Sequence, residues 1–136
     1  MTTELTVLAL AGLLQGIQFM LMAVPVNREI GTSKTMSPRD EARLGGPIGS
    51  QVSVPTGRLI RAMNNHFEAL ILFTIAVVVI SQSGQSSGFT GLCAWSYLLA
   101  RLLYIPAYVF GWVPWRSIIW AVSFLASMAM MLAALF

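Results

Sequence analysis

Polar residues at helical spacing stand out within an apolar part of the chain. Arg61, Asn65 and Glu68 are separated by four and then three positions, so on a helix they fall within ~60° of one another. A guanidinium, an amide and a carboxylate on one face either pair with neighbouring helices or bind a charged ligand. The spacing therefore predicts a polar helix face with a structural or a binding role.

A second polar face is expected later in the chain. Arg101, Tyr104 and Tyr108 have the same helical spacing and share one face. Arg116 and Ser117 follow after a short connection, at the start of the last apolar run. These residues are expected to meet the first polar face at one end of the folded chain.

Glu68 and Arg101 are expected to form an ion pair, because each is the only charged residue deep in its apolar run. A charge at membrane depth costs at least ~2.5 kcal/mol. Such a pair alone could be structural and fix the register of two helices. One carboxylate cannot neutralise Arg61, Arg101 and Arg116 together, however. The surplus of guanidinium groups indicates an anionic ligand with several carboxylates.

The composition shows what kind of fold must position these residues. The chain has 136 residues, of which 57% are apolar and 10% are charged, whereas soluble domains carry roughly a quarter charged residues. A soluble fold would lack the polar surface to cover this much apolar material. The net charge of +3 is spread between the apolar runs and forms no clustered basic face, so no nucleic-acid partner is expected.

Four apolar runs occupy residues 5–24, 59–80, 89–110 and 115–136. A helix of ~20 residues crosses the ~30 Å hydrocarbon core of a bilayer, and backbone groups at that depth must pair within the segment. The sequence therefore predicts an all-α, integral membrane four-helix bundle that forms a single domain over residues 1–136. The connection at 25–58 is expected to be turn-rich, with a short helix at most.

The distribution of charge predicts the orientation in the membrane. The 25–58 connection carries five Lys/Arg residues, the second connection is uncharged, and the third leads directly into Arg116. Four crossings place the first and third connections on one side, which the positive-inside rule assigns to the cytoplasm. Both termini are then outside. A multi-pass protein of a bacterial inner membrane is the expected location.

Metal chemistry is not expected. The chain has a single His66 and a single Cys93, which are too few for a zinc site or an intrachain disulfide. His66 lies ~100° around the helix from Asn65, and Cys93 is interpreted as a packing residue.

The polar segments together resemble the MAPEG family, the membrane-associated proteins in eicosanoid and glutathione metabolism. The resemblance is strongest to the microsomal prostaglandin E synthase branch. The matching stretches are residues 38–40, 45–47, 58–68, 101–108 and 116–117. The pattern RxxRAxxNxxE in 58–68 is specific when it opens a second membrane helix. The chain departs from that branch at Asn64, Tyr104 and Trp120, where the branch has arginine, histidine and tyrosine.

The resemblance implies a homotrimer that binds glutathione at subunit interfaces in the cytoplasmic half of the membrane. The residues that would hold glutathione are Arg61, Asn65, Glu68, Arg101, Tyr104 and Tyr108. Arg116 would lie beside the sulfur and stabilise the thiolate, and Ser117 would donate a hydroxyl. Asp40 would orient Arg116. A lipophilic electrophile would enter directly from the bilayer.

Three functions are compatible with these residues. The first is a glutathione transferase, with or without peroxidase activity, that acts on a lipophilic substrate. The second is a binding or scaffold protein of the same fold without turnover, which would have no need of the thiolate-stabilising Arg116. The third is a small transporter that uses Glu68 and Arg101, against which the lack of an inverted repeat argues.

Overall fold

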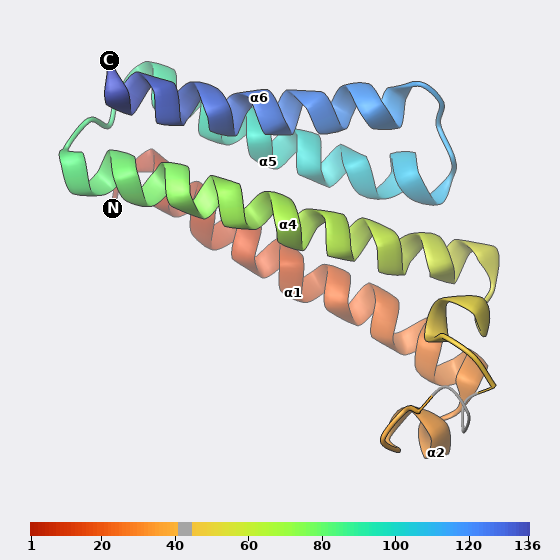
Figure 1. Ribbon diagram of the computed structural model, residues 1–136. Helices are drawn as coiled ribbons and strands as arrows, with labels where there is room; N and C mark the ends of the chain where they lie inside the picture. The colour runs from red at the N-terminus through yellow and green to blue at the C-terminus, as the bar shows by residue number, and fades with distance from the viewer. Residues whose placement is uncertain (41–44) are drawn as a thin grey trace.

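The computed structural model describes residues 1–40 and 45–136, and every regular element in these residues is helical. In chain order the elements are α1 (Thr3–Ile30), α2 (Thr32–Thr35), the 3-10 helix η1 (Ile48–Ser50), α4 (Val54–Ser83), α5 (Gly88–Val109) and α6 (Trp115–Leu135). The four long helices pack as one bundle (Figure 1). The predicted all-α four-helix bundle is therefore confirmed.

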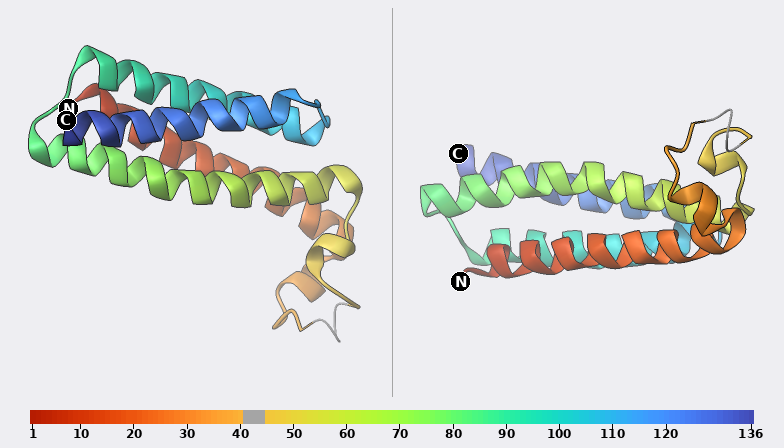
Figure 2. Two further views of the ribbon diagram at one scale, coloured as in Figure 1. Left: turned by 45° about the horizontal axis from the view of Figure 1, so that its top comes forward. Right: turned by 90° about the horizontal axis from the view of Figure 1, so that it is seen from below.

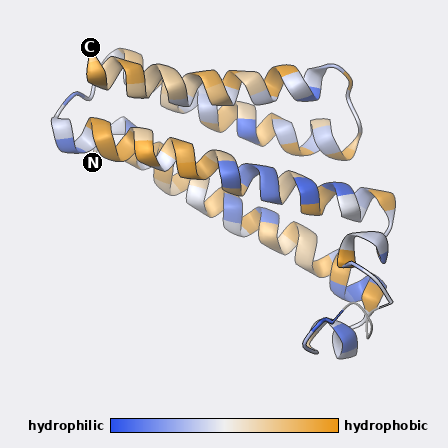
Figure 3. Ribbon diagram, in the orientation of Figure 1, coloured by the Kyte–Doolittle hydropathy of each residue, from blue (hydrophilic) through white to orange (hydrophobic). Residues whose placement is uncertain are grey.

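Each long helix is able to cross a membrane. The shortest of them, α6, has 21 residues, which gives a length of ~31 Å at 1.5 Å per residue. All four are apolar over a window of at least 18 residues. Figure 3 shows that the polar residues of α4 gather in the half that leads from η1, whereas the half that leads to α5 is apolar. The chain is thus an integral, multi-pass membrane protein.

The helices extend beyond the predicted spans. Helix α1 was expected to end near Pro25 but continues to Ile30, and α4 begins at Val54. A proline removes a single backbone hydrogen bond, and in an apolar surrounding the remaining backbone groups still favour the helix. The Asn27 side chain also donates to the carbonyl oxygen of Ala23 at 2.8 Å. The first connection is therefore shorter than expected.

Helix α4 contacts the other three long helices, and α5 packs most extensively against α6. Both chain termini lie at the same end of the bundle, where α4 connects to α5 (Figures 1 and 2). The opposite end holds the turn between α5 and α6 and the segment that contains α2 and η1. In the core, the ring of Phe73 stacks on Tyr97 with centres 3.9 Å apart.

A carboxylate holds each end of α1 in place. At the N-terminal end, Glu4 accepts hydrogen bonds from Ser86, at 2.8 Å, and from Thr90. At the other end, Glu29 accepts from the backbone N–H of Ser53, at 2.6 Å, and from the hydroxyl of Thr56. These contacts fix the position of α1 along its axis against the starts of α5 and α4.

Candidate functional site

Arg101 lies at the centre of a layer of polar side chains from α4, α5 and α6, which we call the polar layer. Its side chain is 1% exposed. Its Nη2 donates to the amide oxygen of Asn65 on α4 at 2.9 Å, and its Nη1 donates to the hydroxyl of Ser123 on α6 at 3.4 Å. The guanidinium also lies over the ring of Tyr104, 4.3 Å from its centre. Three helices thus hold one guanidinium in a fixed position.

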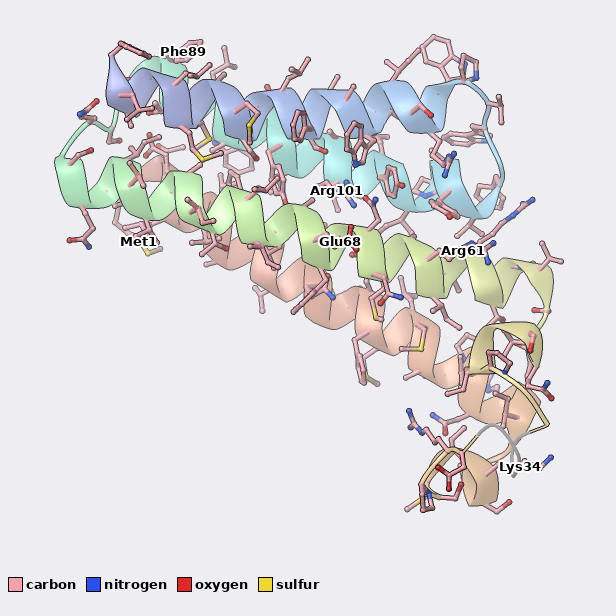
Figure 4. The ribbon with its side chains drawn as sticks, viewed as in Figure 1. Met1, Lys34, Arg61, Glu68, Phe89 and Arg101 are labelled. Carbon is pink, nitrogen blue, oxygen red and sulfur yellow. The ribbon has the colours of Figure 1, made fainter. Side chains whose placement is uncertain are left out.

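The prediction of an ion pair between Glu68 and Arg101 is wrong. The hydrogen-bond acceptors of Arg101 in the described residues are Asn65 and Ser123, both neutral. Glu68 lies midway along α4 and is exposed. Figure 4 shows Glu68 and Arg101 at a similar depth in the bundle, with Arg61 nearer to its end. Because neutral groups do not cancel its charge, Arg101 retains its attraction for an anion.

Two further arginines converge on Tyr108. The Nε of Arg61 donates to the phenol oxygen of Tyr108 at 3.1 Å. On the other side, the guanidinium of Arg116 lies 4.9 Å from the centre of the same ring. Tyr104 packs edge-on against Tyr108 with centres 5.7 Å apart. Each of the three guanidinium groups therefore contacts Tyr104 or Tyr108, and these neutral side chains do not cancel the positive charges.

Two adjoining cavities lie among these side chains. One of about 200 Å³ is lined by Asn65, Tyr104, Arg116, Ser117 and Trp120. A second, of about 130 Å³, shares Asn65 and Trp120 with the first and extends along α4 to Glu68. One cation, Arg116, and one carboxylate, Glu68, therefore line the two cavities together with neutral hydrogen-bonding groups. Arg101 and Arg61 lie next to them and bond to Asn65, in the shared wall, and to Tyr108.

Asp40 lies apart from this region. It is exposed in the segment after α2, and Figure 1 shows that segment beyond the ends of α1 and α4, away from the turn between α5 and α6. No contact between Asp40 and Arg116 is formed within the described chain. The predicted role of Asp40 stays a prediction. Its sequence neighbours Glu41 and Arg43, counted among the charges of this connection, lie outside the described residues.

Sequence reasoning missed several residues that line the second cavity. Tyr97, Phe124 and Ser127 contribute to its wall. Tyr97 precedes Arg101 by four positions, so the helical spacing already placed it on the same face. The wall formed by α6 was harder to predict, because its side chains are small or apolar and do not differ from lipid-facing ones.

Other polar residues near the site have structural roles. The Nη1 of Arg58 donates to the carbonyl oxygen of Val109 at 2.9 Å, which ties the start of α4 to the end of α5. His66 is buried and its Nδ1 is 2.7 Å from Oε1 of Gln15 on α1. Residues 1–40 and 45–136 contain no group of three potential metal ligands.

The sequence was compared with known families, curated proteins and solved structures. The sequence model of the MAPEG family matches residues 7–136, which includes all the helices that form the two cavities. No curated protein and no solved structure gave a match. The family match therefore supports the resemblance seen in the polar segments, without selecting a branch.

Proposed function

The chain belongs to the MAPEG family, and we propose that it is a membrane-embedded, glutathione-dependent transferase. One observation carries this proposal. Two adjoining cavities within a membrane-spanning bundle are lined by one guanidinium, of Arg116, and by one carboxylate, of Glu68. Two further guanidinium groups, of Arg101 and Arg61, lie next to them. Such an excess of cationic donors requires an anionic ligand at this depth.

The charges of glutathione match those of the cavities. The tripeptide has two carboxylates, one ammonium group and one thiol. Arg61 and Arg101 would bind the carboxylates, and Glu68 would bind the ammonium group. Asn65, Tyr104 and Tyr108 would complete the binding set as neutral hydrogen-bonding or packing partners. The burial of Arg101 strengthens its interaction with a carboxylate relative to water.

Arg116 would act on the sulfur. A thiol is a weak nucleophile until it ionises, and a guanidinium fixed nearby lowers its pKa. Arg116 lines the larger cavity together with Ser117, whose hydroxyl would donate a hydrogen bond to the thiolate. The sulfur would then attack an electrophilic carbon or oxygen of a lipophilic substrate. A peroxidase reaction would use the same thiolate.

The setting of Glu68 favours an assembly of several chains. An exposed carboxylate at membrane depth costs at least ~2.5 kcal/mol if lipid surrounds it, and Glu68 is exposed midway along α4. A neighbouring protomer would cover the cavities and exclude lipid. It would also offer a second Asp40 to Arg116, which the same chain does not reach. We therefore propose a homotrimer with a shared site at each interface.

Two finer assignments belong to this proposal. From the motif in 58–68 we propose that the chain is nearest to the microsomal prostaglandin E synthase branch, without assigning prostaglandin synthesis to it. The cationic connection between α1 and α4, together with Arg116, would lie in the cytoplasm, with both termini outside. A bacterial inner membrane is the proposed location.

Thiolate formation tests the proposal directly. Purified protein in detergent is titrated with glutathione near neutral pH, and the ultraviolet band of the thiolate is recorded with binding measured by calorimetry. Arg116→Ala should lose the band and keep most of the binding. Arg28→Ala, an exposed arginine at the end of α1, serves as the matched control and should behave as wild type.

The other outcomes separate the alternatives. Binding without a thiolate band in the wild type would support a non-catalytic scaffold of the same fold. No saturable binding of glutathione would refute the proposed function and return Arg61, Arg101 and Arg116 to a structural or transport role.

A further inference from the structure

Beside the two cavities, three buried side chains each retain an unused polar group. In the described part of the chain, Nε2 of His66, the hydroxyl of Tyr97 and Nε of Arg101 have no hydrogen-bond partner. Their side chains are at most 1% exposed. An unsatisfied polar group is costly in an apolar interior, and no lipid can satisfy it. Since the three groups do not bond to one another directly, their presence in one layer indicates a buried water molecule that bridges them.

The hydrogen bond of His66 to α1 assigns its proton. Nδ1 of His66 is 2.7 Å from Oε1 of Gln15, and an amide oxygen only accepts hydrogen bonds. Nδ1 therefore carries the proton in the neutral ring, and Nε2 is left as an acceptor. A donor on the opposite side of the imidazole would complete its hydrogen bonding.

Tyr97 lies beside the imidazole. The rings of His66 and Tyr97 have centres 6.5 Å apart, and because neither polar group has a direct partner, one water molecule between them would join the phenol to the imidazole. Tyr97 also precedes Arg101 by four positions on α5, which places both side chains on one helix face. Such a water can accept from Nε of Arg101 and donate to Nε2 of His66 while it bonds to the phenol.

We propose that Arg101, Tyr97, His66 and Gln15 form a water-bridged hydrogen-bond relay across α5, α4 and α1 that positions the Arg101 guanidinium for an anionic ligand. The ligand in this statement rests on the proposed function, whereas the relay itself does not. Tyr97 and His66 are positioning residues in the relay, because the hydroxyl of Tyr97 and Nε2 of His66 are buried and act on the ligand through Arg101.

The geometry explains why a third contact on Arg101 matters. Asn65 and Ser123 hold its two terminal nitrogens, and the relay holds Nε. A guanidinium fixed at all three nitrogens has no freedom to rotate, so less entropy is lost when an anion binds. The relay also joins the site to α1. This helix is itself held at both ends by hydrogen bonds to the segments that begin α4 and α5.

The single histidine makes the relay measurable. Full-length protein labelled with ¹⁵N-histidine gives one pair of imidazole signals, which report the tautomer and the hydrogen bonding of each nitrogen. We expect a neutral ring protonated at Nδ1 with a hydrogen-bonded Nε2. Tyr97→Phe, which keeps the ring stacked on Phe73, should shift the Nε2 signal. Ser81→Ala removes another buried hydroxyl without a partner in the described residues and should leave both signals unchanged.

A binding measurement tests the positioning role. Loss of one hydrogen bond that holds Arg101 should weaken glutathione binding roughly fivefold in Tyr97→Phe. Ser81→Ala should bind as wild type, and both variants should unfold at similar denaturant concentrations.

Each outcome decides one part of the inference. A ring protonated at Nε2, or an Nε2 signal that ignores Tyr97→Phe, overturns the relay. A shifted signal with unchanged glutathione affinity overturns the positioning role. A wild type that shows the predicted imidazole signals but binds no glutathione leaves the relay standing and overturns the proposed function together with the positioning of a ligand.

Discussion

Replacement of Glu68 by glutamine separates a binding role from a structural one. The change keeps the size of the side chain and removes its charge. Because the hydrogen bonds of Arg101 go to Asn65 and Ser123, the loss of the Glu68 charge breaks no ion pair with Arg101. Glu68→Gln should therefore keep the free energy of unfolding within about 1 kcal/mol of wild type, or raise it by up to ~2.5 kcal/mol.

The same change should weaken ligand binding. A charge-assisted hydrogen bond to an ammonium group contributes roughly 1.5–3 kcal/mol, so the glutathione dissociation constant should rise about 10- to 100-fold. A glutathione analogue without the α-amino group should bind Glu68→Gln and wild type with similar affinity, since it lacks the group that Glu68 would hold. Calorimetry with both ligands isolates this single contact.

The stability measurement can refute the reasoning. Removal of one partner from a buried ion pair costs about 3–5 kcal/mol. If Glu68→Gln lowers the free energy of unfolding by that amount, Glu68 pairs with a cation in the assembled protein and does not serve as a free ligand group. Equal losses of affinity for glutathione and for the analogue would refute the assignment of the ammonium group. Asn64→Ala, an exposed change one turn away on α4, is the control for general effects.

Three more predictions concern residues around the same layer. Arg101→Met should leave the Asn65 amide oxygen without its donor, lower the free energy of unfolding by about 1–3 kcal/mol and abolish glutathione binding; unchanged denaturation and calorimetry would contradict it. Arg116→Lys keeps the charge but loses the planar contact with Tyr108, so the thiolate band should shrink and not vanish; a full-sized band would argue against a geometric role. Phe73→Ala should cost about 3–5 kcal/mol in chemical denaturation, because its ring is fully buried, and a loss under 1 kcal/mol would mean that the core repacks.

The sequence predicted the four long helices, because apolar length and backbone hydrogen bonding determine a membrane span. A run of ~20 apolar residues without a way to hydrate its backbone must be helical. The ends of the helices were less predictable. Pro25 was read as a terminus, but α1 continues for five more residues and ends where Gly31 adopts a positive φ of 97°. A lone proline does not outweigh the backbone pairing on either side of it.

The sequence predicted which site residues share a helix face, and it did not predict which side chains contact one another. Helical spacing grouped Arg101 with Tyr104 on one face of α5, and the Arg101 guanidinium lies over the Tyr104 ring. The expectation that the two polar faces meet at one end holds for Arg61 and Tyr108, which form a hydrogen bond. Spacing does not give the rotation of one helix against another, which decides whether Arg101 meets Asn65 or Glu68. Asn65 is the residue that meets it. The proposed relation of Asp40 to Arg116 would need a contact between protomers, which no helical periodicity can supply.

The neutral partners of Arg101 have an electrostatic consequence for the proposed chemistry. Arg116 and Glu68 line the cavities with one charge of each sign. Arg61 and Arg101 lie next to them and bring the positive charges around the site to three. Glutathione with an intact thiol compensates only part of this excess, since its two carboxylates are offset by its ammonium group. The thiolate form adds the one further negative charge that makes the complex neutral. In a membrane, where an uncompensated charge is expensive, the bundle itself would therefore favour ionisation of the bound thiol. An ion pair between Glu68 and Arg101 would have weakened the attraction of Arg101 for the bound anion.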